Sequence, residues 1–515
     1  MKITKLFTWD SCLMIGLAIL SSCNDFLDEP TSKTNNIEIK TVEQIEALFG
    51  DVTNLYRETN GTSCYGTDDY GLIKEMYDAS TRAYNIQAVQ YATWDVESIK
   101  SDALRSDWTS EYKKIFYANM VLNSIGDLSG NQDQKEELIA EAHLIRAYAY
   151  ISLANTYCLP YCEKYKNEPG LPLKQSTNFE EISSRSTLKE THDLIAKDLE
   201  AAASIKRKLV AGEPTRSWRA SSGAVNAVSA RYWLMRNDYE KALAFAEKAL
   251  DEYNVLVDYN TEMSFSATTF KATVTYKDGS KERVEIVYPY TVYEGSLWAL
   301  SEGTINWKEF YYFKLLENSS SWHIPSQDLL DLYEQNPGDL RREYHIIKHY
   351  SYYKGLRNPA YDYPGYLFFF YNRIPSGPTV SEMYLIKAEC LARQNQIEEA
   401  MEVLNSFRKY RIDEASFTEE TASTPKEAIR KILDERRREM PFTARRADCR
   451  RYSTNDDPND DVEIRRYFYP YTSSGVLTEE EPIEYILTKD SRRWASPLPQ
   501  NDIDSSNGGL KQNEY

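Results

Sequence analysis

Aromatic side chains are the most prominent candidates for ligand recognition in this chain of 515 residues. Tyrosine alone accounts for 40 residues. A tyrosine ring presents a flat apolar face and a polar tip, which suits recognition surfaces that stay wet. Tyrosines gather outside the helical patterns, in residues 65–97, 288–312 and 350–371. This distribution indicates non-covalent recognition, with burial in a core as the competing interpretation for each segment.

Groups that could make or break covalent bonds are harder to find. The chain has no Gly-x-Ser-x-Gly elbow, no glycine-rich phosphate loop and no His-Glu-x-x-His pattern. Its 79 acidic residues contain carboxylate pairs by chance, so they do not establish the two carboxylates about 5–10 Å apart that a glycoside hydrolase needs. We therefore predict that the protein is not an enzyme, and keep a glycoside hydrolase on a helical scaffold as the alternative.

Metal chemistry has one candidate pair. His345 and His349 are four residues apart, which would place both on one face of a helix. A zinc site needs further ligands, and no third ligand is obvious near them. We prefer to interpret them as surface or otherwise satisfied histidines, and we predict neither a bound metal nor a cofactor.

Thiol chemistry is also limited. Beyond residue 23 the cysteines are Cys64, Cys158, Cys162, Cys390 and Cys449. An odd number argues against a complete disulfide framework. Cys158 and Cys162 could pair in an oxidising compartment, whereas Cys390 and Cys449 lie in helical patterns and are expected to be buried thiols.

Charge and hydropathy exclude several classes of partner and of protein. The formal net charge is −18, and an acidic surface repels phosphate backbones, so a nucleic-acid partner is not expected. A hydrophobic fraction of 42 % is enough for a sizeable core, which excludes global disorder. No apolar run reaches the roughly 18 residues that a membrane-spanning helix requires.

The elements that must position the aromatic segments are mainly helical. Apolar residues recur at helical spacing over residues 41–58, 105–125, 134–157 and 187–205, with Ser186 or Thr187 as caps of the last. Glu141–Ala147 and Glu382–Ala388 repeat each other, and each repeat is followed by further amphipathic sequence.

Small residues follow a second regular pattern. Ala230, Trp233, Tyr239, Ala242, Ala246 and Ala249 stand at spacings similar to the tetratricopeptide repeat. The predicted fold class is therefore mainly α, with tetratricopeptide-like helix pairs as a scaffold and large loop-rich insertions that contain short β-hairpins.

The insertions interrupt this scaffold rather than form domains of their own. Residues 268–293 alternate in polarity around Lys277-Asp278-Gly279-Ser280, which predicts a β-hairpin. We expect one domain over residues 41–515. Its scaffold covers about 41–260 and 380–450, and its binding insertions cover about 60–100, 265–375 and 452–490.

The first residues predict export. A basic start with Lys2 and Lys5 precedes the short apolar stretch 12–20, as in a secretory signal. Leu20-Ser21-Ser22-Cys23 resembles the bacterial lipobox, which implies cleavage after residue 22 and lipidation of the Cys23 thiol. Residues 1–22 are then the signal peptide and residues 23–40 a lipidated tether. Lipid chains anchor a protein without a spanning helix.

The whole chain resembles the SusD/RagB family of nutrient-binding outer-membrane lipoproteins. The matching motifs keep their order along the chain: Cys23–Asp28, Trp108-x3-Tyr112-x2-Ile115-x3-Asn119, Glu141–Ala147, Gly170–Leu173, Ile324–Leu330, Glu382–Glu389, Asp434–Glu439, Pro497–Gln500 and Gln512-Asn513. The resemblance implies a lipid-anchored protein that faces the cell exterior. It also implies capture of a glycan or other nutrient and a TonB-dependent, SusC-like transporter as partner. A purely protein-interacting scaffold is a further alternative, because tetratricopeptide-like helices commonly bind partners.

A sugar site needs an aromatic platform and nearby hydrogen-bonding groups. Members of the family tend to bind through regions that correspond to residues 65–97 and 288–312. Within these we predict Trp94 and Trp298 as stacking platforms, Tyr290 as a supporting ring and Arg82 as a hydrogen-bond donor.

Overall fold

Several helices in this protein begin at a side-chain cap that the sequence supplies. The computed structural model describes residues 39–79, 86–100, 106–178, 184–209, 217–291, 307–317, 322–369, 373–472, 474–478 and 480–515. The Thr41 hydroxyl accepts from the Gln44 N–H to start α2 (Val42–Gly50), and Thr187 with Glu190 forms a capping box at α9 (Leu188–Ala202). Residues Thr41–Tyr515 form one compact unit. The predicted signal peptide, tether and Cys23 lie outside the described residues.

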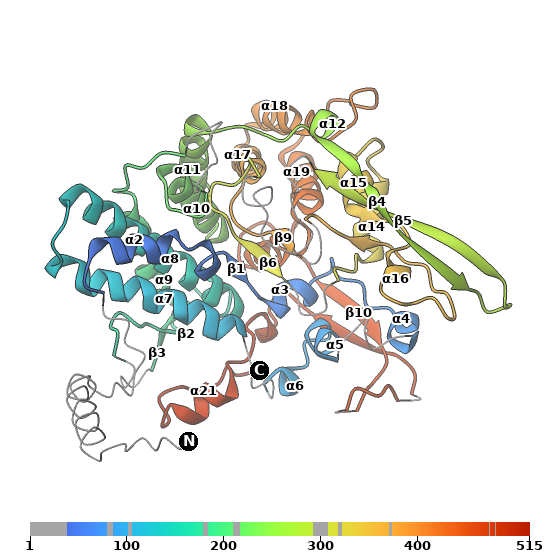
Figure 1. Ribbon diagram of the computed structural model, residues 1–515, viewed down its shortest axis with the longest axis horizontal. Helices are drawn as coiled ribbons and strands as arrows, with labels where there is room; N and C mark the ends of the chain where they lie inside the picture. Colours follow the sequence, from blue (N-terminus) through green and yellow to red (C-terminus); the bar gives the residue numbers. More distant parts are fainter. Residues whose placement is uncertain are drawn as a thin grey trace, which may run out of the picture. The chain divides into compact units, whose positions relative to one another are not determined.

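The first part of the scaffold is a set of long helices that lie side by side. α8 (Gln132–Tyr157) packs against both α7 (Ser106–Ser124) and α9, and the three helices lie in the same part of Figure 1. A short connection joins α7 to α8, whereas the longer segment 158–187 leads from α8 to α9. Their shared core includes Leu144, Leu153 and Ile195, none more than 1 % exposed.

The second part confirms the tetratricopeptide-like pattern. α10 (Ser222–Met235) pairs with α11 (Tyr239–Glu252), α17 (Val380–Arg393) pairs with α18 (Ile397–Arg408), and α19 (Pro425–Glu439) packs on both helices of the latter pair. The predicted alanines Ala230, Ala242, Ala246 and Ala249 are fully buried, and α11 packs directly on α17. Small side chains allow this close helix approach, so the prediction of a mainly α fold is confirmed.

The two repeated motifs share a buried ionic role. Glu141 on α8 accepts from Arg219 at 2.7 Å, and Glu382 on α17 accepts from Arg231 at 3.0 Å and from Arg436 at 3.1 Å. Both carboxylates are at most 1 % exposed. A buried charge needs a hydrogen-bonded partner, so the repeat marks points where separate segments are tied together.

The insertion between the two helix pairs carries the predicted hairpin. β4 (Met263–Thr275) and β5 (Lys281–Thr291) pair antiparallel, with Thr275 opposite Lys281 across the turn. The hairpin runs past α15 (Leu340–His345) and α16 (Tyr350–Tyr353), as Figure 1 shows. The same insertion contains α14 (Gln327–Glu334), β7 (Ile346–Ile347) and β8 (Gly365–Tyr366).

The remaining elements are short and connect these parts. They are η1 (Val52–Asn54), β1 (Arg57–Glu58), α3 (Gly61–Tyr65), α4 (Lys74–Ala79), α5 (Ile86–Ala92), α6 (Val96–Lys100), η2 (Ile125–Asp127), β2 (Pro169–Pro172), β3 (Arg185–Thr187), α12 (Tyr259–Glu262), β6 (Leu315–Glu317), β9 (Arg373–Pro375), α20 (Arg445–Tyr452), β10 (Ile464–Phe468), β11 (Ile483–Leu487), η3 (Arg492–Trp494) and α21 (Gln500–Ser505). β1 joins β6 and β9 in a three-stranded sheet, which ties the start of the unit to the insertion. None of the helices in the described part combines the length and apolar character needed to cross a bilayer.

Aromatic residues of the insertions mostly build a core. Tyr350, Tyr352, Tyr366 and Phe369 are each 2 % exposed, so packing explains the described aromatic residues between 350 and 371 better than a second binding surface does. In the segment 288–312, Trp307, Tyr311 and Tyr312 are also buried, and in the first segment Tyr65 and Tyr70 are. Irregular loops leave irregular gaps, and large rings fill them.

Candidate ligand-binding site

The structure describes the side chain of one of the four predicted sugar-binding residues and the backbone of a second. Arg82 and Trp298 lie outside the described residues. Tyr290 belongs to β5, where its backbone is opposite Ser264, and its side chain is outside the described part. Trp94 is the predicted site residue whose side chain the structure describes.

Trp94 is a core residue in this structure. Its ring is 3 % exposed, and its indole N–H donates to the Gly66 carbonyl at 3.0 Å. The Arg466 guanidinium lies 5.8 Å from the ring centroid. Stacking requires an open ring face, so the predicted platform at Trp94 is corrected: this tryptophan holds α5 and the segment after it against β10.

A groove of about 880 Å³ runs between the hairpin and the elements α14, α15 and β7. Its size falls in the range of small-molecule sites. The hairpin contributes Phe265, Glu285 and Val287, and the opposite wall includes Arg342, Ile346 and His349. The groove therefore lies in the insertion that carries the second predicted aromatic segment.

The hairpin wall offers an exposed apolar surface. Phe265 is 45 % exposed and Val287 is 38 % exposed. The Phe265 ring is backed by Tyr344, with centroids 5.1 Å apart. On the other face of the hairpin Ala272, Val274 and Ile286 are buried. One face of the hairpin is thus buried in the core, and the other face exposes the Phe265 ring to solvent.

Polar side chains on the groove are hydrogen-bonded to neighbouring side chains. Arg342 Nε lies 2.9 Å from Glu334, and His349 Nδ1 lies 2.9 Å from Asp362. Glu285 accepts from the Thr269 hydroxyl at 2.5 Å, and this hydrogen bond lowers the Glu285 pKa. These groups supply hydrogen-bond donors and acceptors, which fits a hydroxyl-bearing ligand.

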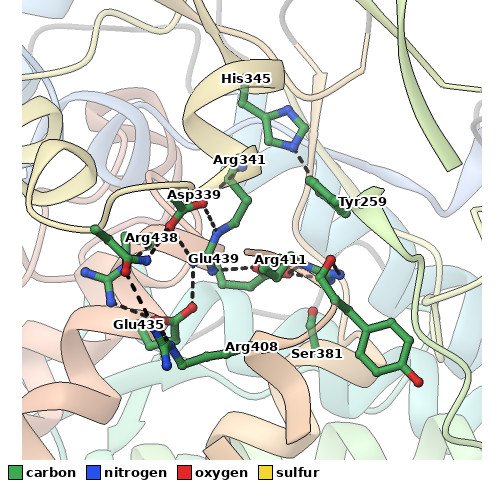
Figure 2. A network of polar contacts seen from close by, with 12 residues as sticks. Tyr259, Asp339, Arg341, His345, Ser381, Arg408, Arg411, Glu435, Arg438 and Glu439 are labelled. Carbon is green, nitrogen blue, oxygen red and sulfur yellow. Dashed lines mark hydrogen bonds and ion pairs between the residues drawn. The ribbon is translucent and has the colours of Figure 1, made fainter. Parts of the chain in front are cut away.

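A buried network of ion pairs holds the far wall in place. Figure 2 shows Arg341, the residue before Arg342, between Asp339, Glu435 and Glu439. Arg341 lies 2.7 Å from Asp339, 2.5 Å from Glu435 and 3.0 Å from Glu439. Because Glu435 and Glu439 belong to α19, the network fixes the start of α15 to the helical scaffold.

The same network continues to the end of α18. Arg411 bonds Glu439 at 2.9 Å and Glu309 at 2.8 Å. Burial alone would raise the pKa of Glu439, but Arg411 and Arg341 outweigh it and hold that pKa below its usual range. The Glu439 carboxylate therefore stays charged and ion-paired.

The two histidines of the candidate metal pair, His345 and His349, have different hydrogen-bond partners. α15 ends at His345, whose Nε2 meets the Tyr259 hydroxyl at 2.9 Å and whose Nδ1 meets the Leu367 carbonyl at 2.8 Å. Burial lowers the pKa of His345 to about 4. His349 instead has a left-handed backbone with φ of 60° and pairs with Asp362. Within the described residues no cluster of three metal-ligating side chains occurs.

The cysteines are free thiols in the described part, including Cys158 and Cys162. Cys390 and Cys449 are buried, as predicted. Burial raises the pKa of Cys158 to about 11 and of Cys449 to about 12, so these thiols stay protonated at neutral pH.

Sequence reasoning missed the groove because its walls come from residues far apart in the chain. One local signal was available. In Val284-Glu285-Ile286-Val287 the polar–apolar alternation fails at Val287, which puts an apolar side chain on the outward face. Phe265 carries no comparable sign, because its exposure depends on where α15 lies.

Comparison with known families finds matches at both ends of the chain. The family described as "Starch-binding associating with outer membrane" matches residues 25–234, and the family described as "SusD family" matches residues 380–515. Neither description names a catalytic activity. A curated relative, the SusD-like protein P38 of Formosa agariphila, is 22 % identical over 456 residues and covers 78 % of this chain and 80 % of its own.

Solved structures share the fold. A SusD superfamily protein of Bacteroides thetaiotaomicron has a TM-score of 0.59 at 20 % identity, covering 92 % of this chain and 100 % of its own. A SusD-like carbohydrate-binding protein of Bacteroides vulgatus has a TM-score of 0.61 at 17 % identity, with 92 % and 98 % covered. A laminarin-binding SusD-like protein has a TM-score of 0.55 at 17 % identity, with 92 % and 99 % covered.

Proposed function

The chain belongs to the SusD/RagB family, and from this membership we propose that it binds a glycan or related nutrient at the cell surface and delivers it to a TonB-dependent, SusC-like transporter. Binding leaves the ligand chemically unchanged. The groove between the hairpin and α15 is the observation that carries the proposal, because it combines an exposed ring with paired polar groups. Sugars need both, since their C–H faces stack on rings and their hydroxyls require hydrogen bonds.

The ligand contacts extend beyond the groove in this proposal. Arg82, Tyr290 and Trp298 remain proposed glycan-binding residues, with Trp298 as a platform and Arg82 as a donor. Tyr290 follows the groove residue Val287 along β5, so this one proposed contact belongs to a strand that also lines the groove.

Glycan binding is tested by affinity electrophoresis of the purified protein against a panel of neutral polysaccharides. Phe265→Ala is expected to weaken the retarding interaction about fivefold, the scale of one lost stacking contact. Tyr467→Ala is the matched control, because Tyr467 is 66 % exposed on β10 and outside the groove. No retardation by any glycan would contradict the proposal and favour peptide or glycoprotein ligands.

Anchoring and delivery make separate predictions. Cys23→Ser is expected to move the protein from the membrane fraction to the soluble fraction, because the lipidated thiol is lost. Delivery requires co-purification of a transporter from membranes that express both proteins. Absence of the transporter at every detergent concentration that keeps the protein folded would remove the delivery step and leave glycan binding standing.

The alternatives have clear signatures. A glycoside hydrolase would release reducing sugars from a glycan that the protein binds. A purely protein-interacting scaffold would retain its partner while binding no glycan.

A further inference from the structure

A second cavity lies inside the helical scaffold, away from the groove. It encloses about 100 Å³ between α7, α8, α10 and α20. A smaller cavity of about 30 Å³ continues it, because Asn155 and Tyr232 line both. Ser152 and Asn155 on α8 are partly exposed, so this scaffold cleft is reached from solvent.

Buried polar atoms in the scaffold cleft lack partners. Glu111 is 2 % exposed and Arg436 is 3 % exposed, yet Glu111 Oε2 and Arg436 Nη1 have no hydrogen-bond partner among the described residues. Tyr148, 6 % exposed, contacts Tyr312 and Lys314 through its ring, and no described residue bonds its hydroxyl. Burying unpaired donors and acceptors is costly, so these atoms call for an occupant that can both donate and accept.

Glu111 and Arg436 in the scaffold cleft each have ion-pair partners. Glu111 Oε1 lies 2.6 Å from Lys114 Nζ. Arg436 bonds Asp448 at 2.8 Å and Glu382 at 3.1 Å. The remaining atoms Glu111 Oε2 and Arg436 Nη1 are therefore hydrogen-bonding positions on ion-paired side chains, which favours hydroxyl groups over a charged ligand.

The walls and the volume restrict the occupant further. Apolar side chains of Ile151, Val228 and Leu316 stand beside the polar atoms. One water needs about 10–15 Å³ of such space, so the scaffold cleft has room for roughly seven to ten waters. Water makes no use of apolar walls, whereas a single sugar ring offers both C–H faces and hydroxyls.

We propose that the scaffold cleft is a binding site for one neutral monosaccharide or a cyclic polyol of similar size, held by Glu111, Tyr148, Arg436 and Asn155. The site is separate from the glycan groove and does not depend on it. Burial raises the pKa of Tyr148 well above its usual value, so its hydroxyl stays protonated and donates.

Isothermal titration calorimetry with D-glucose, D-galactose, D-mannose, D-xylose and myo-inositol tests the proposal on the purified protein. At least one probe is expected to bind. Tyr148→Phe is expected to weaken that binding about three- to tenfold, because one hydrogen bond is lost. Asn155→Leu, which fills the mouth of the cleft, is expected to abolish it.

Tyr150→Phe is the matched control on α8, because the Tyr150 hydroxyl donates to the Lys174 carbonyl instead of lining the cleft. It is expected to lower the melting temperature and leave probe affinity unchanged. Phe265→Ala is also expected to leave it unchanged. Three outcomes would overturn the proposal. They are no binding by any of these probes, binding of L-alanine as a non-sugar probe without binding of any sugar, and a loss of affinity in Tyr150→Phe as large as in Tyr148→Phe.

Discussion

The helix-pair scaffold and the central insertion bury different kinds of side chain. Where α11 meets α17 the core consists largely of alanines and other aliphatic residues. Around the hairpin and α14–α16 the core is crowded with tyrosine, phenylalanine and tryptophan. Regular helices can approach closely over small residues, whereas short elements and loops leave wide gaps that only large rings fill.

Tyrosine has a second use in the insertion. Loops lack the regular hydrogen-bond ladders of helices and sheets, so their carbonyls need other donors. The Tyr363 hydroxyl donates to the Pro325 carbonyl at 2.9 Å. Helix ends have the same need, and the Tyr333 hydroxyl donates at 2.7 Å to the carbonyl of Arg438 in the last turn of α19. The tyrosine excess is thus explained chiefly by packing of irregular backbone, and recognition is left to a few exposed rings.

The largest expected effect tests the network that joins the two regions (Figure 2). Arg341→Met leaves Asp339 and Glu439 buried with one partner fewer, so the free energy of unfolding should fall by about 3–5 kcal/mol. Urea unfolding measures this. Arg342→Gln is the neighbouring control, since the Arg342 side chain is 45 % exposed and such pairs contribute at most about 1 kcal/mol. Equal losses in both variants would mean that the network does not hold the regions together.

A pH effect is expected at the same junction. His345 has a folded pKa of about 4, below its unfolded value of about 6.5, so the folded state binds fewer protons between these limits. The contribution of neutral His345 to the free energy of unfolding is complete above about pH 6.5 and is lost as the pH falls toward 4. Unfolding at pH 5.0 should therefore need about 2 kcal/mol less than at pH 7.5 from this residue alone. His345→Gln should remove that difference, and an unchanged pH profile would contradict it.

The alanine core of the scaffold should resist added volume. Ala246→Leu places a larger side chain at a fully buried position on α11 and should destabilise the protein by about 1–3 kcal/mol. Ala244→Leu, on the exposed side of the same helix, is the control and should change stability little. Thermal unfolding compares the two. If both variants behave alike, the close packing of α11 on α17 is not what limits side-chain size there.

The smallest effect isolates one tyrosine hydroxyl of the insertion. Tyr363→Phe removes the donor to Pro325 and should cost about 0.5–1.5 kcal/mol in chemical unfolding. Tyr467→Phe should cost almost nothing, because Tyr467 is exposed and its hydroxyl meets only Glu484. A neutral Tyr363→Phe would weaken the idea that tyrosine hydroxyls satisfy the loop backbone.

Much of the helical scaffold could be predicted from the sequence. Alanines at tetratricopeptide-like spacing predicted α10 and α11, and the turn signal Lys277–Ser280 predicted the hairpin within a few residues. These patterns are local, because helical and strand periodicities are properties of neighbouring residues. Trp94 shows the limit, since no local pattern says whether a loop tryptophan faces solvent or a core.

The sequence by itself therefore determined the mainly α class, the positions of the helix pairs and the kinship to SusD/RagB proteins. The tertiary structure alone decided which rings stay exposed, that Phe265 faces Arg342 and His349 across a groove, and that Glu111, Tyr148 and Arg436 share an inner cleft. The reason is physical. Periodicity tells which face of one element is apolar, but exposure at a site depends on which distant segment covers that face.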